Sequence, residues 1–125
     1  MPSYLTEEPL LDLGQIALLK AALGDADLQD MLSDFSTAAR EAFVVIDTAL
    51  ASDDLIEARR AAHAFKGVAG SFGAARLAAI AVDMELRADS IAYIRQRMNA
   101  LSDAIEETGA VLCEAGRAAL ADVAL

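Results

Sequence analysis

One segment of the chain, residues 61–77, combines residue types that could perform chemistry on a helix surface. It contains the only histidine of the protein, His63, and Lys66 follows three residues later, which brings the two side chains together on a helix. An imidazole ring can act as a nucleophile and carry a group covalently. The neighbouring ammonium group would stabilise an anion on that ring through a charge-assisted contact. A phosphoryl group on a ring nitrogen would fit both side chains.

Two glycines, Gly67 and Gly70, continue the stripe of His63 along the same helix, and Ala74 extends it. A glycine inside a helix costs about 1 kcal/mol relative to alanine, so this choice needs a reason. The opposite stripe carries core-type residues, namely Phe65, Val68, Ala69 and Phe72. We therefore expect His63 to face solvent, with clearance above it for a docking partner. Close packing between helices is the alternative explanation for the glycines.

Basic residues gather around this segment. Residues 55–82 contain four basic side chains and one acid, a net charge of +3 in a chain whose total is −10. Such a basic island would attract an anionic partner, and the candidates for docking are Arg59, Arg60, Ser71 and Arg76. The arginines could equally be solvated, and Ser71 could be only a polar helix end. Glu85 could approach His63 from the next helix, but spacing does not establish this, and a role away from His63 is favoured.

The elements that position these residues are predicted to be helices. Proline occurs only at positions 2 and 9, and the chain is rich in alanine and leucine. We predict a short helix within 10–23 ended by Gly24, and a long helix capped by Asp25 or Asp27 that ends near Leu50. After a break at 51–54, further helices are predicted at 53–72, at 74–88 and from Ser90 onward.

These amphipathic helices predict an all-α fold, an antiparallel up-down-up-down four-helix bundle with a short additional N-terminal helix that caps one end. We expect a flexible N-terminal lead at 1–9, one helical domain at 10–120 and a C-terminal tail at 121–125. The single cysteine, Cys113, allows no internal disulfide, supplies no metal-ligand set and is most simply a small buried residue.

Composition also restricts the class of partner and the compartment. The acidic net charge argues against binding nucleic acid or an anionic membrane surface. No apolar run approaches the roughly 18 residues needed to span a bilayer. The N-terminus is acidic and lacks the basic start of a secretory signal. We therefore expect a soluble and cytoplasmic protein.

The motif resembles the signature of histidine phosphotransfer (HPt) domains. In that family the pattern His-x-apolar-Lys-Gly precedes a run of small residues and Gly-Ala, as do His63–Gly67 and the residues from Ala69 to Ala74 here. The resemblance extends over about residues 10–110. It implies that His63 accepts a phosphoryl group from the aspartate of a receiver domain, that Lys66 stabilises it, and that Gly67 leaves room for the incoming aspartyl phosphate.

The resemblance further implies a monomeric phosphocarrier in a multistep relay, with receiver domains of response regulators, a hybrid histidine kinase, or both as partners. No cofactor is expected, because the Mg²⁺ of such relays belongs to the receiver's aspartate site. A sensor kinase is disfavoured because 125 residues leave no room for an ATP-binding domain. A kinase dimerisation domain usually has an acid directly after its histidine, where this chain has Ala64. A helical adaptor whose histidine is never modified remains an alternative, and a hydrolase with His63 as general base is weaker.

Overall fold

The computed structural model describes residues 9–87 and 89–124, and the side chains of Cys113 and of residues 115–124 are outside the description. Residues 1–8 of the lead expected at 1–9, and the expected burial of Cys113, therefore lie outside the described part. Over the described ranges the chain forms helices and no strand. This confirms the all-α prediction.

The first described helix, α2, runs from Leu13 to Leu23. Its N-cap is Asp12, whose side chain accepts a hydrogen bond from the Gln15 amide at 3.0 Å. Gly24 ends it with a φ of 81°, as predicted for a residue that needs the left-handed region. Gly24 is also the N-cap of α3, Asp25–Ser33, so the prediction of Asp25 or Asp27 as N-cap is wrong. Both acids lie in the first turn instead, where they complement the helix dipole.

The long second helix of the prediction is interrupted. It is divided at Asp34 into α3 and α4, Phe35–Ala51. The hydroxyl of Ser33 donates to the Asp30 carbonyl at 2.8 Å, and the Asp34 amide bonds to Met31 instead. This local competition for backbone groups is the way serine disturbs helices, and apolar periodicity cannot reveal it.

The next two helices form the hairpin that carries the motif. Asp54 is the N-cap of α5, Leu55–Ser71, and accepts from the Glu57 amide at 3.1 Å, which confirms the predicted restart after 51–54. Gly73, with a φ of 67°, makes the turn into α6, Ala75–Leu86. The last helix, α7, runs from Ile91 to Ala124 and so extends beyond residue 120, where we placed the end of the domain.

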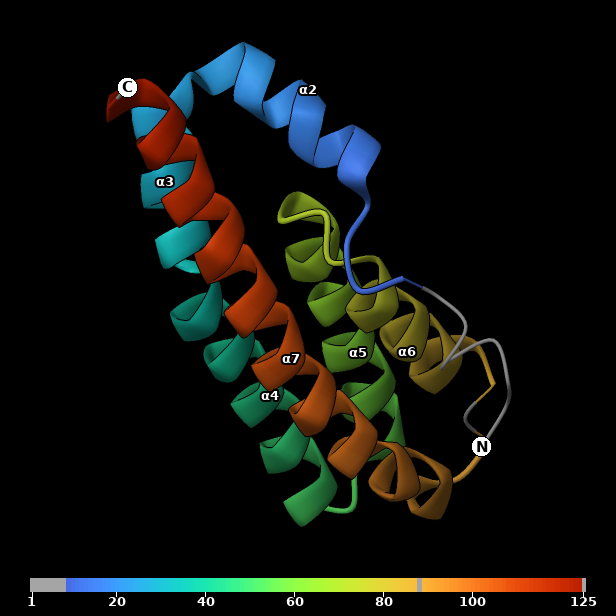
Figure 1. Cartoon of the computed structure of the whole chain (residues 1–125). Helices are drawn as coiled ribbons and strands as arrows, with labels where there is room; N and C mark the ends of the chain where they lie inside the picture. The colour runs from blue at the N-terminus through green and yellow to red at the C-terminus, as the bar shows by residue number, and fades with distance from the viewer. Residues whose placement is uncertain (1–8, 88, 125) are drawn as a thin grey trace.

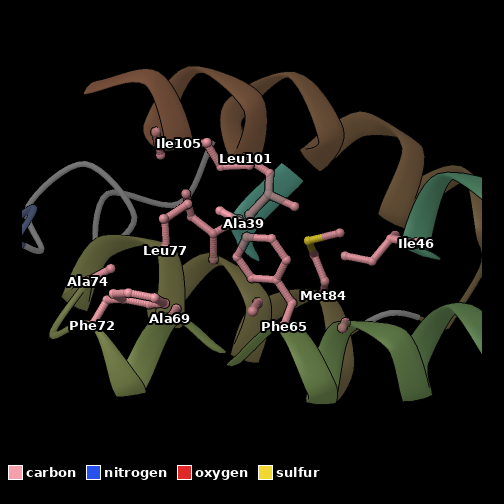
Figure 2. Packing of buried hydrophobic residues seen from close by; sticks show 14 of the residues in the cluster. Ala39, Ile46, Phe65, Ala69, Phe72, Ala74, Leu77, Met84, Leu101 and Ile105 are labelled. Atoms are coloured by element: carbon pink, nitrogen blue, oxygen red, sulfur yellow. The ribbon is translucent and has the colours of Figure 1, made fainter. Parts of the chain in front are cut away.

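The helices pack as an antiparallel bundle in which α3 and α4 run together as one rod beside α7, and α5 and α6 lie against them (Figure 1). Phe65 and Met84 point into the interior between α5, α6 and α7, near Leu101 (Figure 2). The helix α2 crosses one end of the bundle and packs against α3 (Figure 1). The predicted bundle with an end-capping helix is confirmed. The preceding segment is tied to the α5–α6 turn, because the Asp12 amide donates to the Gly73 carbonyl at 2.8 Å.

Candidate functional site

His63 lies in the middle of α5 on the side that faces away from the core. Its side chain is 61% exposed, whereas Phe65 and Ala69 on the opposite side are buried. The expected division of α5 into an apolar stripe and a solvent-facing stripe is therefore confirmed. The stripe is shorter than predicted: α5 ends at Ser71, and the turn at Gly73 carries Ala74 into the core instead of leaving it in line with His63.

Glu85 joins His63 and Lys66 from the last turn of α6. One oxygen, Oε1, lies 2.8 Å from His63 Nδ1, and the other, Oε2, lies 3.8 Å from Lys66 Nζ. The Glu85 side chain is only 21% exposed. The expectation that Glu85 stays away from His63 is wrong, because the rotation of α6 against α5 brings its carboxylate over the ring.

This contact decides which ring nitrogen can react. In a neutral imidazole one nitrogen carries the proton and the other a lone pair, and the hydrogen bond at one nitrogen selects the tautomer. An ionised carboxylate accepts hydrogen bonds and cannot donate one. Glu85 therefore selects the tautomer in which Nδ1 of His63 carries the proton. The lone pair then lies on Nε2 of an exposed ring, where a partner can reach it.

The three arginines around the motif bond to different residues of the domain. Arg59 donates from Nε to the Glu85 backbone carbonyl at 2.9 Å. Arg60 pairs with Glu57 on its own helix at 2.8 Å, and Arg76 pairs with Glu107 of α7 at 3.4 Å. Two acids outside residues 55–82 pair with cations of this segment, Glu85 with Lys66 and Glu107 with Arg76, so part of its net charge is compensated across helices.

The two glycines of the stripe border open space. Among the described residues, a Cβ atom built on Gly67 or Gly70 would have no neighbour within 4 Å, so neither glycine serves close packing between the described helices. Gly70 instead offers its carbonyl to the side chain of Gln15, at the start of α2. Ser71 donates its hydroxyl to the Gly67 carbonyl at 3.0 Å, which is a helix-end contact. Both glycines therefore border open space, which argues against the packing alternative.

Two shallow depressions border the exposed stripe of α5, one lined by His63 and the other by Lys66 and Gly70. One, of about 410 Å³, is lined by Ile56, Arg59, Arg60, His63 and Glu85. The other, of about 360 Å³, lies between the start of α2 and the α5–α6 hairpin, and Lys66, Gly70 and four alanines of α6 and its N-cap are among its lining residues. The exposed stripe of α5 is thus bordered by a basic hollow and by a small-residue hollow.

No described helix is both long and apolar enough to cross a membrane. Within the same residues, no three side chains of His, Cys, Asp or Glu gather in a way that could hold a metal ion.

Comparison with known proteins identifies the family. The family model of the Hpt domain matches residues 30–111, more than half of the chain and inclusive of the whole motif. The chain belongs to the Hpt domain family. No curated protein and no solved structure matches it. Hpt domains are phosphocarriers without catalytic activity of their own, and they interact with the kinase and receiver domains of two-component systems.

For this Hpt domain, sequence reasoning considered a contact of Glu85 with His63 but favoured a role elsewhere, and it did not anticipate the contact of Arg59 with Glu85. A signal for Glu85 existed: His63 lies ten residues before Gly73 and Glu85 lies twelve after it. In an antiparallel helical hairpin, residues at similar distances from the turn lie at the same level. The residues Leu77, Ala81 and Met84 mark the buried side of α6, and Glu85 lies about 100° from Met84. The sign of that rotation, toward α5, required the three-dimensional structure.

Proposed function

We propose that this Hpt domain carries a phosphoryl group on His63 between the aspartates of receiver domains in a multistep phosphorelay. The observation that supports this most strongly is the exposed imidazole whose Nδ1 lies 2.8 Å from the Glu85 carboxylate. Its partners are response-regulator receivers, a hybrid histidine kinase, or both. The cytoplasmic location and monomeric state expected from the sequence stay predictions.

The proposed transfer needs no separate proton acceptor, because the attacking nitrogen carries no proton. The Nε2 lone pair attacks the phosphorus of an aspartyl phosphate; a P–N bond forms, and the bond from phosphorus to the aspartyl oxygen breaks, which releases the carboxylate. The proton on Nδ1 stays in its hydrogen bond to Glu85. In the second step an aspartate of the next receiver attacks phosphorus, so a P–O bond forms and the P–N bond breaks. The imidazole returns to its starting tautomer.

The proposed role of Lys66 differs from that of the two glycines, Gly67 and Gly70. Lys66 Nζ is 3.8 Å from Glu85 Oε2, a weak contact that an incoming phosphoryl oxygen could replace with a charge-assisted one. The open space at both glycines supports their assignment as clearance for the partner. The transferring groups must approach to about 3 Å in line, so a side chain at Gly67 would obstruct them.

The proposed docking residues differ in the contacts they make within the domain. Arg60 lines the basic hollow beside His63 and is largely exposed, which suits a rim contact with an acidic receiver surface. Ser71 and Arg76 stay candidates, although each already bonds within the domain, to Gly67 and Glu107 respectively.

The decisive experiment is phosphoryl transfer to the His63→Gln variant. A receiver domain phosphorylated with radiolabelled acetyl phosphate in the presence of Mg²⁺ should label the wild-type chain and not the variant. The label should be acid-labile and base-stable, as expected for a P–N bond. Because His63 is exposed and outside the core, the free energy of unfolding of the variant should lie within about 0.5 kcal/mol of that of wild type.

Two outcomes would contradict the proposal. Equal labelling of both proteins, or a label with the stability of a phosphate ester, would place the modification on another residue. Tight binding of receivers without any label on His63 would instead support the alternative, an adaptor that only binds its partner.

A further inference from the structure

Three side chains of α5 converge on one residue of α6. Arg59, His63 and Lys66 are spaced at i, i+4 and i+7, which places them on one stripe of the helix. All three contact Glu85: Arg59 at its backbone carbonyl, His63 at Oε1 and Lys66 at Oε2. Arg60, one position along, points about 100° away and pairs with Glu57 instead.

The contact made by Arg59 differs in kind from the other two. Glu85 lies next to Leu86, the last residue of α6, where the final carbonyls of a helix have no partner within it. Arg59 supplies that partner from the neighbouring helix, with its Nε 2.9 Å from the Glu85 oxygen. A guanidinium group is always charged, and a bond from it to a carbonyl is stronger than one between neutral groups.

We propose that Arg59 is a positioning residue, which holds the end of α6 so that the Glu85 carboxylate stays on His63 Nδ1. The backbone of Glu85 is attached to α5 through Arg59, and its side chain then reaches His63 and Lys66 from a set position. Without Arg59 the last turn of α6 is free to fray, since helix ends without capping partners open first. This inference rests on the proposed function for its kinetic part, but its structural part does not.

The first test measures the tautomer of His63 directly. His63 is the only histidine, so a ¹⁵N-labelled full-length chain gives one pair of ring-nitrogen signals. At a pH where the ring is neutral, wild type should show a protonated Nδ1 and an unprotonated Nε2. In Arg59→Ala the two nitrogen shifts should move toward each other, because an imidazole released from Glu85 populates both tautomers. Arg59→Lys should recover the wild-type pattern in part, since an ammonium group can also donate to the carbonyl.

Arg60→Ala is the matched control. It removes the same charge from the same helix and from the same hollow, but Arg60 has no contact with Glu85 among those described. Its ring-nitrogen shifts should equal those of wild type. Circular dichroism and thermal unfolding of both variants should show intact folds, because each arginine lies on an exposed surface.

The second test separates positioning from docking by kinetics. With a receiver phosphorylated by acetyl phosphate as donor, Arg59→Ala should lower the transfer rate at saturating donor about fivefold, with the half-saturating concentration nearly unchanged. The defect should persist at high salt, where screening abolishes the contribution of an exposed docking charge.

The result that overturns the proposal is equally specific. Wild-type ring-nitrogen shifts in Arg59→Ala, or an equal shift in Arg60→Ala, would show that Arg59 does not hold Glu85. A defect confined to donor affinity and relieved by salt would make Arg59 a docking residue. If wild type accepts no phosphoryl group at all, the proposed function fails, and the ring-nitrogen measurement still decides the role of Arg59.

Discussion

Asp83 and Glu85 are two carboxylates on the same helix, two residues apart, in opposite surroundings. Two residues correspond to about 200° of helix rotation, so the side chains leave α6 on nearly opposite sides. Asp83 turns toward α7 and is fully buried, with a side chain 0% exposed. Glu85 turns toward α5 and lies at the surface beside His63.

The surroundings of Asp83 are closed. Its Oδ2 accepts from the Tyr93 hydroxyl at 2.7 Å and from Arg97 Nε at 3.3 Å, and Arg87 lies 3.8 Å from Oδ1. The Arg97 guanidinium also stacks 4.6 Å from the centre of the Tyr93 ring. Burial alone lowers the pKa of Arg97, but its contacts with Tyr93 and Asp83 outweigh burial and raise it.

The surroundings of Glu85 are open on one side. Its partners come from α5, and one of them, His63, exposes most of its ring to solvent. Within the described part of the chain, Glu85 Oε2 accepts no hydrogen bond, and its ionic contact is with the ammonium of Lys66 at 3.8 Å. Asp83, enclosed by donors, joins α6 to α7. Glu85 leaves its partner His63 exposed, so it can orient a reactive group.

The largest expected effect is on stability, from Asp83→Ala. Removing this carboxylate leaves Arg97 largely buried and unpaired, which should lower the free energy of unfolding by about 3 kcal/mol. Glu85→Ala is the matched control and should cost less than about 1 kcal/mol, because its ion pairs are partly solvated. Urea unfolding of both variants measures the difference. Similar losses at the two positions would remove the distinction between a structural and a functional carboxylate.

A second prediction concerns the open side of the site. In Gly67→Gln the long side chain should fill the space one turn beyond His63 and slow phosphoryl transfer about a hundredfold by preventing in-line approach. Stability should hold or rise by up to about 1 kcal/mol, because glutamine favours helix more than glycine does. Gly67→Ala is the graded control: its single methyl group meets nothing within 4 Å, so transfer should fall far less. Undiminished transfer in Gly67→Gln would refute the clearance role.

The smallest of these effects is expected from Lys66→Ala. The phosphoryl group should lose one charge-assisted contact, so transfer should slow about tenfold while His63 still accepts the group. Arg76→Ala removes an equal charge that pairs with Glu107 of α7, and at high salt its rate should stay within about twofold of wild type. Transfer rates at low and high salt compare the two variants. A wild-type rate in Lys66→Ala would mean that another cation stabilises the phosphoryl group.

Features that depend on residues close together in the chain could be predicted from the sequence. Gly24 and Gly73 end or turn helices because they adopt positive φ, and Asp54 starts one because its side chain caps a backbone amide. The division of α5 into buried Phe65 and exposed His63 follows from helical periodicity. The motif and the family it indicates could likewise be recognised from the amino-acid sequence alone. Even here Ser33 and Asp34 interrupt a helix whose apolar spacing is continuous, because a side chain competes for a backbone carbonyl.

Only the tertiary structure decided which side chains meet across helices. The contact of Glu85 with His63, the bond from Arg59 to the Glu85 carbonyl and the pairing of Arg76 with Glu107 all join different helices. Each depends on how far one helix is rotated and shifted against another, and that is set by packing of the whole core. The sequence by itself determined the helices and the nucleophile; the packing determined the carboxylate that orients it, because a rotation of one residue, about 100°, would turn Glu85 away from His63.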